Sequence, residues 1–255
     1  MSEAMLAQTI EYTDADDQRT EAYLVVPTSG QEVGPRRGGV IVIHHFPGYD
    51  RGTKEIARRI ADLGYDVILP NLYTRESADP VEAAEIVRAA RGIADARLVA
   101  TVAGAASYLR ALDSSNGKVG VIGYCSGGRH TVLAACNVAL DAAVDCYGAY
   151  VTGTPPVDFL LNITNLVDQL ENLSCPLLGM FGNDDTAPTA AHVDDLAQRL
   201  DALGKPYEFH RYDGAGHAFF AVDRPAAYRA EAAADGWEHI ATFFAAHLAL
   251  GAGRG

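Results

Sequence analysis

Short runs of β-branched and other apolar residues alternate along the chain with longer segments of helical periodicity. The short runs predict strands at 20–27, 39–45, 65–70, 118–123, 142–148, 176–182 and 206–212. The longer segments predict helices near 53–63, 80–91, 94–112, 127–139, 189–203 and 225–249. Strict alternation of strand and helix predicts an α/β fold, in which a mostly parallel sheet carries helices on both faces.

The size and composition of the chain fit one such domain. Its 255 residues are 49% hydrophobic, which is enough for a substantial core, so residues 1–255 are expected to form a single α/β domain. In the helix predicted at 53–63, Ile56 and Ile60 recur on one face, whereas Arg58 and Arg59 are expected to face away from the core.

The charge of the chain narrows the possible partners. The formal net charge is −13 and the few Lys and Arg are scattered, so no basic surface is predicted that could neutralise nucleic-acid phosphates or anionic lipids. The N-terminal segment has no basic stretch followed by an apolar core, and no apolar run approaches membrane-spanning length. We therefore expect a cytoplasmic protein, a monomer or small homo-oligomer, that binds neither nucleic acid nor membrane.

The segment GYCSGG, residues 123–128, lies between a predicted strand and a predicted helix. Glycines two residues before and after Cys125 permit a sharp turn that lifts one side chain into a cleft. The other cysteines, Cys136, Cys146 and Cys175, are widely spaced and form no CxxC pair, so they predict neither a zinc site nor a disulfide. Cys125 is the candidate nucleophile, and the other three are interpreted as core residues.

Two further candidates follow later strands, in the chain order of an α/β-hydrolase triad. Asp184 follows strand 176–182, and His217 follows strand 206–212. Ligands bind at the carboxyl ends of parallel strands, so we expect His217 to act as the base for Cys125 and Asp184 to orient the imidazole. Asp185 is adjacent to Asp184, and the choice between them stays open.

Two backbone N–H groups are expected to stabilise a negatively charged oxygen. One belongs to Ser126, which follows the nucleophile at the start of a predicted helix. The other lies in the loop after strand 39–45, where Pro47 has no N–H and Phe46 is the simplest donor. Tyr124, beside the nucleophile, is a candidate residue of the pocket wall.

The segments GYCSGG, GNDD, GAGHAF and PNLYTR together resemble the dienelactone hydrolase family, the carboxymethylenebutenolidases of the α/β-hydrolase fold. The resemblance extends from about residue 20 to 247. It implies an eight-stranded sheet without a large cap domain, hydrolysis of an enol-lactone through a thioester acyl-enzyme, and no cofactor. It carries the family's nucleophile, acid, base and oxyanion donors onto the five residues nominated above for those roles.

The same resemblance bears on the substrate. The arginine that contacts the substrate carboxylate in the family falls on Arg75. Where the family's type member has a glutamate after the third strand, this chain has His45, which we expect to contact the thiol and modulate its ionisation. A second arginine of the family falls on Ala221, and Arg224 lies three residues further on. These departures widen the expected substrate to a small, anionic lactone, ester or thioester.

Three alternatives stand beside this hypothesis. The chain could be a broad carboxylesterase or thioesterase with a pocket shaped by residues 148–176, or a non-catalytic ligand-binding or redox-sensing protein with Cys125 as a regulatory thiol. A metal site at His44 and His45 is disfavoured, because neighbours in an extended segment point to opposite faces, and no metal ligands are assigned. The remaining histidines are interpreted as surface or helix-face residues: His130, His192, His210, His239 and His247.

Overall fold

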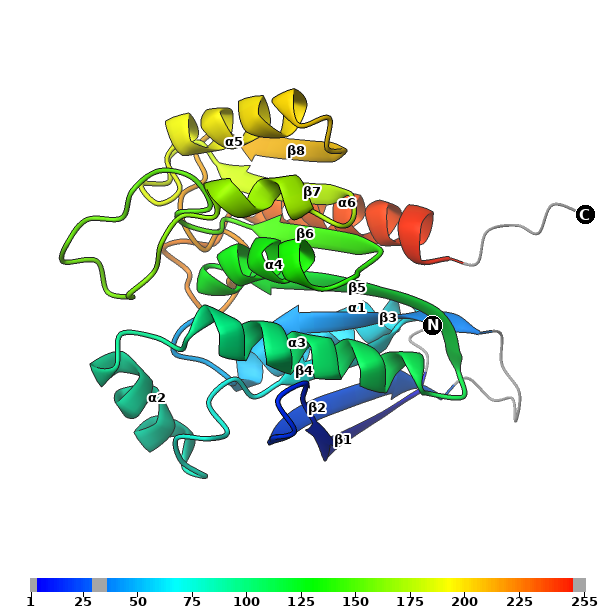
Figure 1. The fold of residues 1–255 in the computed structure, drawn as a ribbon. Coiled ribbons are helices and arrows are strands. Elements are labelled where there is room, and N and C mark those ends of the chain that lie inside the picture. The colour runs from blue at the N-terminus through cyan, green and yellow to red at the C-terminus, as the bar shows by residue number, and fades with distance from the viewer. Residues whose placement is uncertain (1–3, 29–35, 250–255) are drawn as a thin grey trace, which may run out of the picture.

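The computed structural model describes residues 4–28 and 36–249, which share one eight-stranded sheet (Figure 1). In chain order the strands are β1 (Met5–Thr13), β2 (Arg19–Pro27), β3 (Arg37–Ile43), β4 (Asp66–Pro70), β5 (Ser115–Tyr124), β6 (Ala142–Cys146), β7 (Leu177–Gly182) and β8 (Tyr207–Tyr212). Their order across the sheet is β1-β2-β4-β3-β5-β6-β7-β8. β2 is antiparallel to both of its neighbours, and all other neighbouring pairs are parallel.

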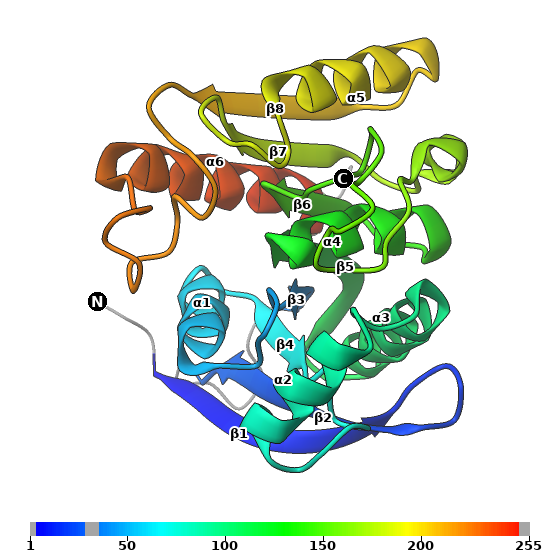
Figure 2. The ribbon, with the colours of Figure 1, turned by 90° about the vertical axis from the view of Figure 1, so that its left-hand side faces the viewer.

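Helices cover both faces of the sheet, as the view along the strands in Figure 2 shows. They are α1 (Arg51–Asp62), α2 (Pro80–Ala89), α3 (Asp95–Arg110), α4 (Ser126–Asn137), α5 (Ala190–Ala202) and α6 (Ala230–Leu248), with a 3₁₀ helix, η1, at Val167–Asn172. Apolar residues of α1 and α6 pack on one face, and those of α2 to α5 pack on the other. Among the helices of the described ranges, none combines the length and the apolar character needed to cross a lipid bilayer.

Strand β3 shows why the central sequences are continuously apolar. Successive side chains of a strand point to opposite faces, so Val40 and Val42 pack with α1 and α6 while Ile41 and Ile43 pack with the helices of the other face. All four side chains are buried. A parallel strand covered on both faces therefore has no polar alternation.

The predicted α/β architecture is confirmed, and the predicted strands and helices are present with bounds that differ by a few residues. Strand 142–148 ends early because Tyr147 has φ 47°, in the left-handed region, which cannot continue a strand. The helix predicted from residue 225 begins at Ala230. The preceding residues form turns instead, in which the N–H groups of Ala227 and Tyr228 both donate to the Arg224 carbonyl.

Strand β1 is not among the strands predicted from the sequence. This strand forms an edge of the sheet and pairs only with β2, in a register from Met5 opposite Pro27 to Thr13 opposite Arg19. Most of its side chains are exposed. An exposed edge strand needs few apolar residues, so the segment lacks the buried run that identifies the other strands.

The turn between β5 and α4 depends on close backbone approach. Cys125 has φ 58° and ψ −122°, a conformation that is strained for a residue with a side chain. A Cβ atom at Gly123 would lie 2.0 Å from the Gly127 carbonyl oxygen, and one at Gly127 would lie 2.3 Å from the Ile43 carbonyl oxygen. Glycine at both positions thus lets the turn close and presents Cys125 at the end of the strand.

A buried arginine fixes the segment between β6 and β7. Arg129 of α4 is almost fully buried and makes two hydrogen bonds to the Asp95 carboxylate, of 3.0 and 2.9 Å. The same guanidinium donates to the Thr164 carbonyl at 3.2 and 2.8 Å. Arg129 therefore ties residues 147–176 to the first turn of α3, which positions one wall of the cleft described below.

This clamp predicts the effect of one substitution. Arg129→Gln should lower the free energy of unfolding by about 3 kcal/mol, because charge-assisted hydrogen bonds are lost and polar atoms are left unpaired in the interior. Urea denaturation measures the change. The matched control is Arg199→Gln, which removes an exposed i,i+4 pair with Asp195 and should cost about 0.5 kcal/mol or less. Equal losses in the two variants would contradict this account.

Candidate active site

Three candidate groups meet at the carboxyl edge of the parallel strands, the edge that faces the viewer in Figure 2. Cys125 lies between β5 and α4, Asp185 lies in the turn after β7, and His217 lies in the loop after β8. Asp185 Oδ2 is 2.8 Å from His217 Nδ1. The imidazole also interacts with the Cys125 thiol. The structure therefore brings together a thiol, an imidazole and a carboxylate in the order that the strand ends predict.

The acid of this group is Asp185, and the expectation for Asp184 is wrong. Asp184 is exposed, and its N–H donates to the Ala215 carbonyl. The side chain of Asp185 is 1% exposed, and its second oxygen accepts the Ala187 N–H at 2.8 Å. Adjacent side chains in this turn diverge, so only one of the two carboxylates can face the imidazole.

The charge state of His217 follows from its two partners. Burial alone would lower the pKa of His217, but the hydrogen bond with Asp185 and the interaction with Cys125 outweigh burial and raise the pKa to about 10. The imidazole is then positively charged at neutral pH. The sulfur of Cys125 therefore lies beside a positively charged imidazole, at the N-terminus of α4.

Tyr147, which was not predicted from the sequence, packs against the imidazole and belongs to a group of aromatic side chains. The Tyr147 ring lies edge-on to His217 with centroids 5.1 Å apart, and Phe219 and Phe220 pack against Tyr147. Tyr124, which was expected in the pocket wall, packs against Tyr147 and Phe220 and lines the cavity beside Cys125. The position of Tyr147 directly after β6, at the ligand-binding edge of the sheet, is the feature of the sequence that could have indicated its place in the site.

The loop that carries Tyr147 is held by a buried carboxyl group. Asp145 Oδ1 accepts the Gly148 N–H at 2.7 Å, and burial raises the pKa of Asp145 to about 7 although this hydrogen bond lowers it. A Cβ atom at Gly128 would lie 2.3 Å from the same Oδ1. Asp145 thus joins the end of β6 to the first turn of the helix that follows the nucleophile.

The two nominated oxyanion donors lie beside Cys125. Ser126 is the first residue of α4, so its N–H has no partner within the helix. Phe46 follows β3, and both residues line a cavity of about 250 Å³ that Cys125 and His217 also line. Its other wall includes Phe159, Leu160 and Leu161 from the segment 147–176, so the cavity is mainly apolar.

A second cavity, of about 500 Å³, is also lined by Cys125. His45 and Arg224 both line it, so Arg224 reaches the site. Arg59 is exposed, as expected of a residue that faces away from the core, and it also lines this cavity and lies over the Trp237 ring, 4.1 Å from the centroid. Helical periodicity identifies the buried face of α1, but it does not indicate that Trp237 of α6 lies beside Arg59.

Arg75 does not take the place that the resemblance implies. Its guanidinium forms an ion pair with the fully buried Asp14 carboxylate of the β1–β2 turn, and Arg75 lines neither cavity beside Cys125. Asp14 also accepts the N–H groups of Asp16 and Gln18. Burial of Asp14 favours a cationic partner, so the structure gives Arg75 a role in the turn, not in the cleft.

The adjacent histidines have separate environments. His44 is buried; the Leu72 N–H donates to its Nε2, and its Nδ1 lies 2.9 Å from the His45 carbonyl oxygen. Burial lowers the pKa of His44 to about 4. His45 faces the larger cavity, where its Nε2 lies 3.4 Å from Asp50 Oδ2, and burial lowers its pKa. Both ring nitrogens of His44 are therefore engaged, one with the His45 carbonyl oxygen and one with the Leu72 N–H.

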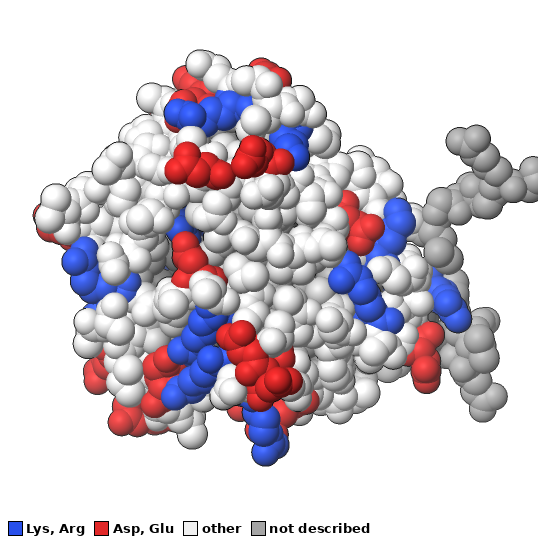
Figure 3. Space-filling view, in the orientation of Figure 1, with Lys and Arg blue, Asp and Glu red and all other residues white. Residues whose placement is uncertain are grey.

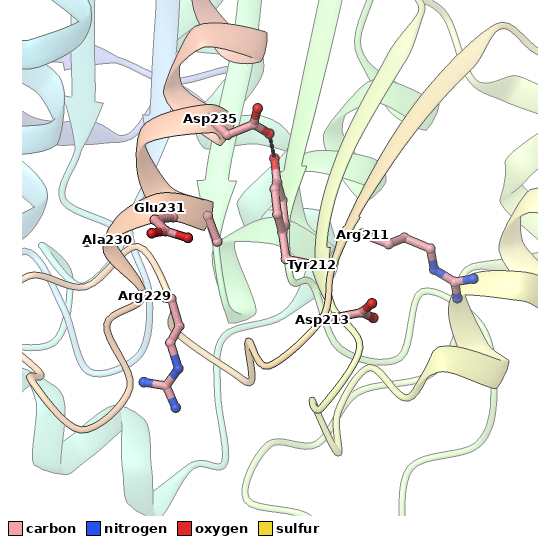
Figure 4. A pocket seen from close by; sticks show the side chains of 8 residues that line it. Arg211, Tyr212, Asp213, Arg229, Ala230, Glu231 and Asp235 are labelled. Atoms are coloured by element: carbon pink, nitrogen blue, oxygen red, sulfur yellow. Dashed lines mark hydrogen bonds between the residues drawn. The ribbon is translucent and has the colours of Figure 1, made fainter.

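A further hollow of about 650 Å³ lies between the end of β8 and the start of α6 (Figure 4). Neither cysteine nor histidine is among the residues that line it, so it offers no nucleophile. On the face seen in Figure 3, acidic and basic side chains are interspersed, without a broad basic patch. The Cys125 thiol and the His217 imidazole line other cavities, described above, and not this hollow.

Comparison with known proteins identifies related sequences over most of the chain. A family model described as the dienelactone hydrolase family matches residues 20–248. A carboxymethylenebutenolidase candidate of Escherichia coli is 33% identical over 255 residues, covering 94% of this chain and 91% of that protein. A similar candidate of Methylorubrum extorquens is 33% identical over 228 residues, covering 88% and 75%.

A solved structure extends the likeness to three dimensions. The crystal structure of a dienelactone hydrolase candidate from Klebsiella pneumoniae is 29% identical, covers 95% of this chain and 99% of that chain, and has a TM-score of 0.82. The eight-stranded sheet, the family match and the relatives agree with one another. This chain therefore belongs to the dienelactone hydrolase family and is a hydrolase of the α/β-hydrolase fold.

Proposed function

We propose that this protein hydrolyses a small lactone or ester through a covalent intermediate on Cys125. The observation that carries the proposal is the contact of His217 with Asp185 on one side and Cys125 on the other, at a strained turn after β5. Such an arrangement supplies a nucleophile, a proton carrier and a group that orients the carrier. The roles of the individual residues follow from this arrangement.

The reaction begins when the Cys125 thiolate attacks the carbonyl carbon and the carbonyl oxygen becomes an oxyanion. The N–H groups of Phe46 and Ser126 donate to that oxyanion. The intermediate collapses to a thioester and expels the alcohol or enol oxygen, which takes the proton of His217. Water then attacks the thioester, neutral His217 accepts its proton, and the carboxylic acid leaves as the thiolate is restored.

The two cavities beside the sulfur suggest how a substrate lies. The larger cavity contains more arginines than carboxylates: Arg51, Arg59 and Arg224 against Glu55 and Asp223. It suits an anionic group. The smaller cavity is mainly apolar and suits a compact hydrocarbon part. A lactone or ester with a carboxylate on one side of the reactive carbonyl fits both.

A broad carboxylesterase or thioesterase is the second candidate, and the smaller cavity favours it. Its apolar wall can accept the acyl or alcohol part of many esters. His45 stands where the family's type member has a glutamate, so activation of the thiol need not follow the type member. Rates on matched panels of lactones, aryl esters and thioesters separate the two candidates, since a lactonase prefers the cyclic member of each pair.

Selective alkylation tests the central assignment. One equivalent of iodoacetamide at pH 6.5 should label Cys125 alone and abolish aryl-ester hydrolysis in proportion to labelling, as measured by mass spectrometry and activity in the same samples. Cys146 is buried, and burial raises the pKa of Cys136 to about 11 and of Cys175 to about 12, so these thiols stay protonated. Activity that survives full labelling of Cys125 would favour a non-catalytic thiol.

Substitution of the two adjacent carboxylates tests the corrected acid. Asp185→Asn should lower kcat/KM by about a thousandfold, because the imidazole loses its orientation and its main electrostatic support. Asp184→Asn is the matched control and should stay within about twofold of the parent protein. A large loss in Asp184→Asn with little change in Asp185→Asn would reverse the assignment.

The same pair of variants has a pH signature. In the parent protein His217 carries its proton below a pKa of about 10. Without the Asp185 carboxylate this raised pKa falls, so the positive charge beside the sulfur is lost at a lower pH in Asp185→Asn. The alkylation rate of Cys125, measured across pH 5 to 10, should therefore reflect the lower pKa of His217 in Asp185→Asn. Asp184→Asn should show the same pH profile as the parent protein.

Kinetics on charged and neutral substrates test the anionic site. Arg224→Gln should raise KM for aryl esters that carry a carboxylate by about tenfold, with little change for neutral esters of the same size, because one cation of the larger cavity is removed. Arg75→Gln is the control, since Arg75 pairs with Asp14 outside both cavities. A selective rise of KM in Arg75→Gln would restore the role that the resemblance implies for it.

A further inference from the structure

A cluster of histidines and carboxylates lies where β8 faces α6, outside both cavities that Cys125 lines. Alternate residues of β8 share one face of the strand, so Glu208 and His210 point the same way. Asp235 and His239 are four residues apart on α6 and share one face of that helix. Within residues 4–28 and 36–249, Glu208, His210 and His239 are the one such group with ligand atoms close enough to hold a metal ion.

The distances in this cluster converge on the Glu208 carboxylate. His210 Nε2 lies 2.6 Å from Glu208 Oε1, and His239 Nδ1 lies 3.8 Å from the same oxygen. The two imidazole rings are stacked with centroids 3.5 Å apart. Three donor atoms from two separate elements are thus gathered at one point of the surface, where all three side chains have access to solvent.

The remaining nitrogen of His239 has a carboxylate partner. His239 Nε2 lies 3.4 Å from Asp235 Oδ2, and the Tyr212 hydroxyl donates to the same oxygen at 2.9 Å. Figure 4 shows Tyr212 of β8 and Asp235 of α6 pointing toward one another. Metal-bound histidines commonly donate their second N–H to a carboxylate, which fixes the tautomer and leaves the other nitrogen free for the ion.

We propose that Glu208, His210 and His239 bind a divalent transition-metal ion of the zinc class, with Asp235 as the positioning residue for His239. Two imidazoles and one carboxylate form a donor set that such ions favour, with water in the fourth position. In a tetrahedral site with metal–ligand distances near 2.0 Å, neighbouring donor atoms are about 3.3 Å apart. The observed 2.6 and 3.8 Å lie on either side of that value.

Binding requires one local adjustment. The lone pair of an imidazole nitrogen lies in the ring plane, and the two ring planes are only 27° apart, so a shared ion requires the rings to rotate out of the stack. Both side chains are partly exposed, which permits the rotation. The bound ion would join the edge strand β8 to α6, because its ligands come from both elements.

The test is zinc titration of the full chain, prepared without a histidine tag and with Cys125 alkylated so that its thiolate cannot bind the ion. Calorimetry should give one equivalent of Zn²⁺ per chain. His210→Gln and His239→Gln should each weaken binding at least tenfold, and Asp235→Asn should weaken it by about tenfold through loss of the outer carboxylate. His247→Gln, on the same helix as His239, is the matched control and should bind as the parent chain does.

Two further measurements, Co²⁺ absorption and thermal unfolding, identify the ligands and exclude misfolding. Co²⁺ in place of Zn²⁺ on the unalkylated chain should give d–d absorption without a thiolate charge-transfer band, as expected for nitrogen and oxygen ligands. Thermal unfolding without metal should be similar in the parent chain and in the histidine variants, which excludes misfolding as the cause of weak binding. Equal zinc affinity in His239→Gln and His247→Gln, or binding that disappears on alkylation of Cys125, would overturn the proposal.

Discussion

The close backbone approach at the turn after β5 is the constraint on which the rest of the site depends. Cys125 is held at φ 58°, and this conformation is possible because Gly123 meets Gly127 and Gly127 meets the end of β3 without side chains between them. A strained residue persists only where its surroundings determine it. Here the parallel sheet on one side and the first turn of α4 on the other provide that determination. The turn therefore sets both the position of the sulfur and the direction of the Ser126 N–H.

The electrostatic environment, more than the packing, distinguishes Cys125 from the other three cysteines. Three of the four cysteines are buried, and burial raises the pKa of each of them. Cys125 lies instead at a helix N-terminus beside His217, whose proton is retained through Asp185. The imidazole is itself largely enclosed, and enclosure opposes its charge. The Asp185 carboxylate thus offsets a desolvation cost that would otherwise leave His217 neutral. Asp185 is therefore as important to the proposed chemistry as the nucleophile.

The sequence predicts seven of the eight strands, the six α-helices, Cys125 and His217, because each of these depends on local patterns: apolar runs, helical periodicity and glycine spacing. Features that depend on which way a side chain turns were not predicted. Asp184 and Asp185 are adjacent, and only the folded turn decides which faces His217. Arg75 finds its partner 61 residues earlier in the chain, at Asp14. The cluster around Glu208 and His239 could not be predicted either, because its members come from β8 and α6 and no short sequence motif contains them all.

The displacement of Arg75 changes how a substrate anion would be held. In this chain the cations of the larger cavity come from α1 and from the loop before α6, not from the segment after β4. Arg59 lies over the Trp237 ring, and Arg224 acts on the His45 imidazole, whose pKa burial lowers and Arg224 lowers further. A bound carboxylate would reduce the effect of Arg224 on His45 and so favour protonation of that imidazole. Substrate charge and the protonation of His45 would then be coupled, whereas a glutamate at this position would carry a negative charge before the substrate binds.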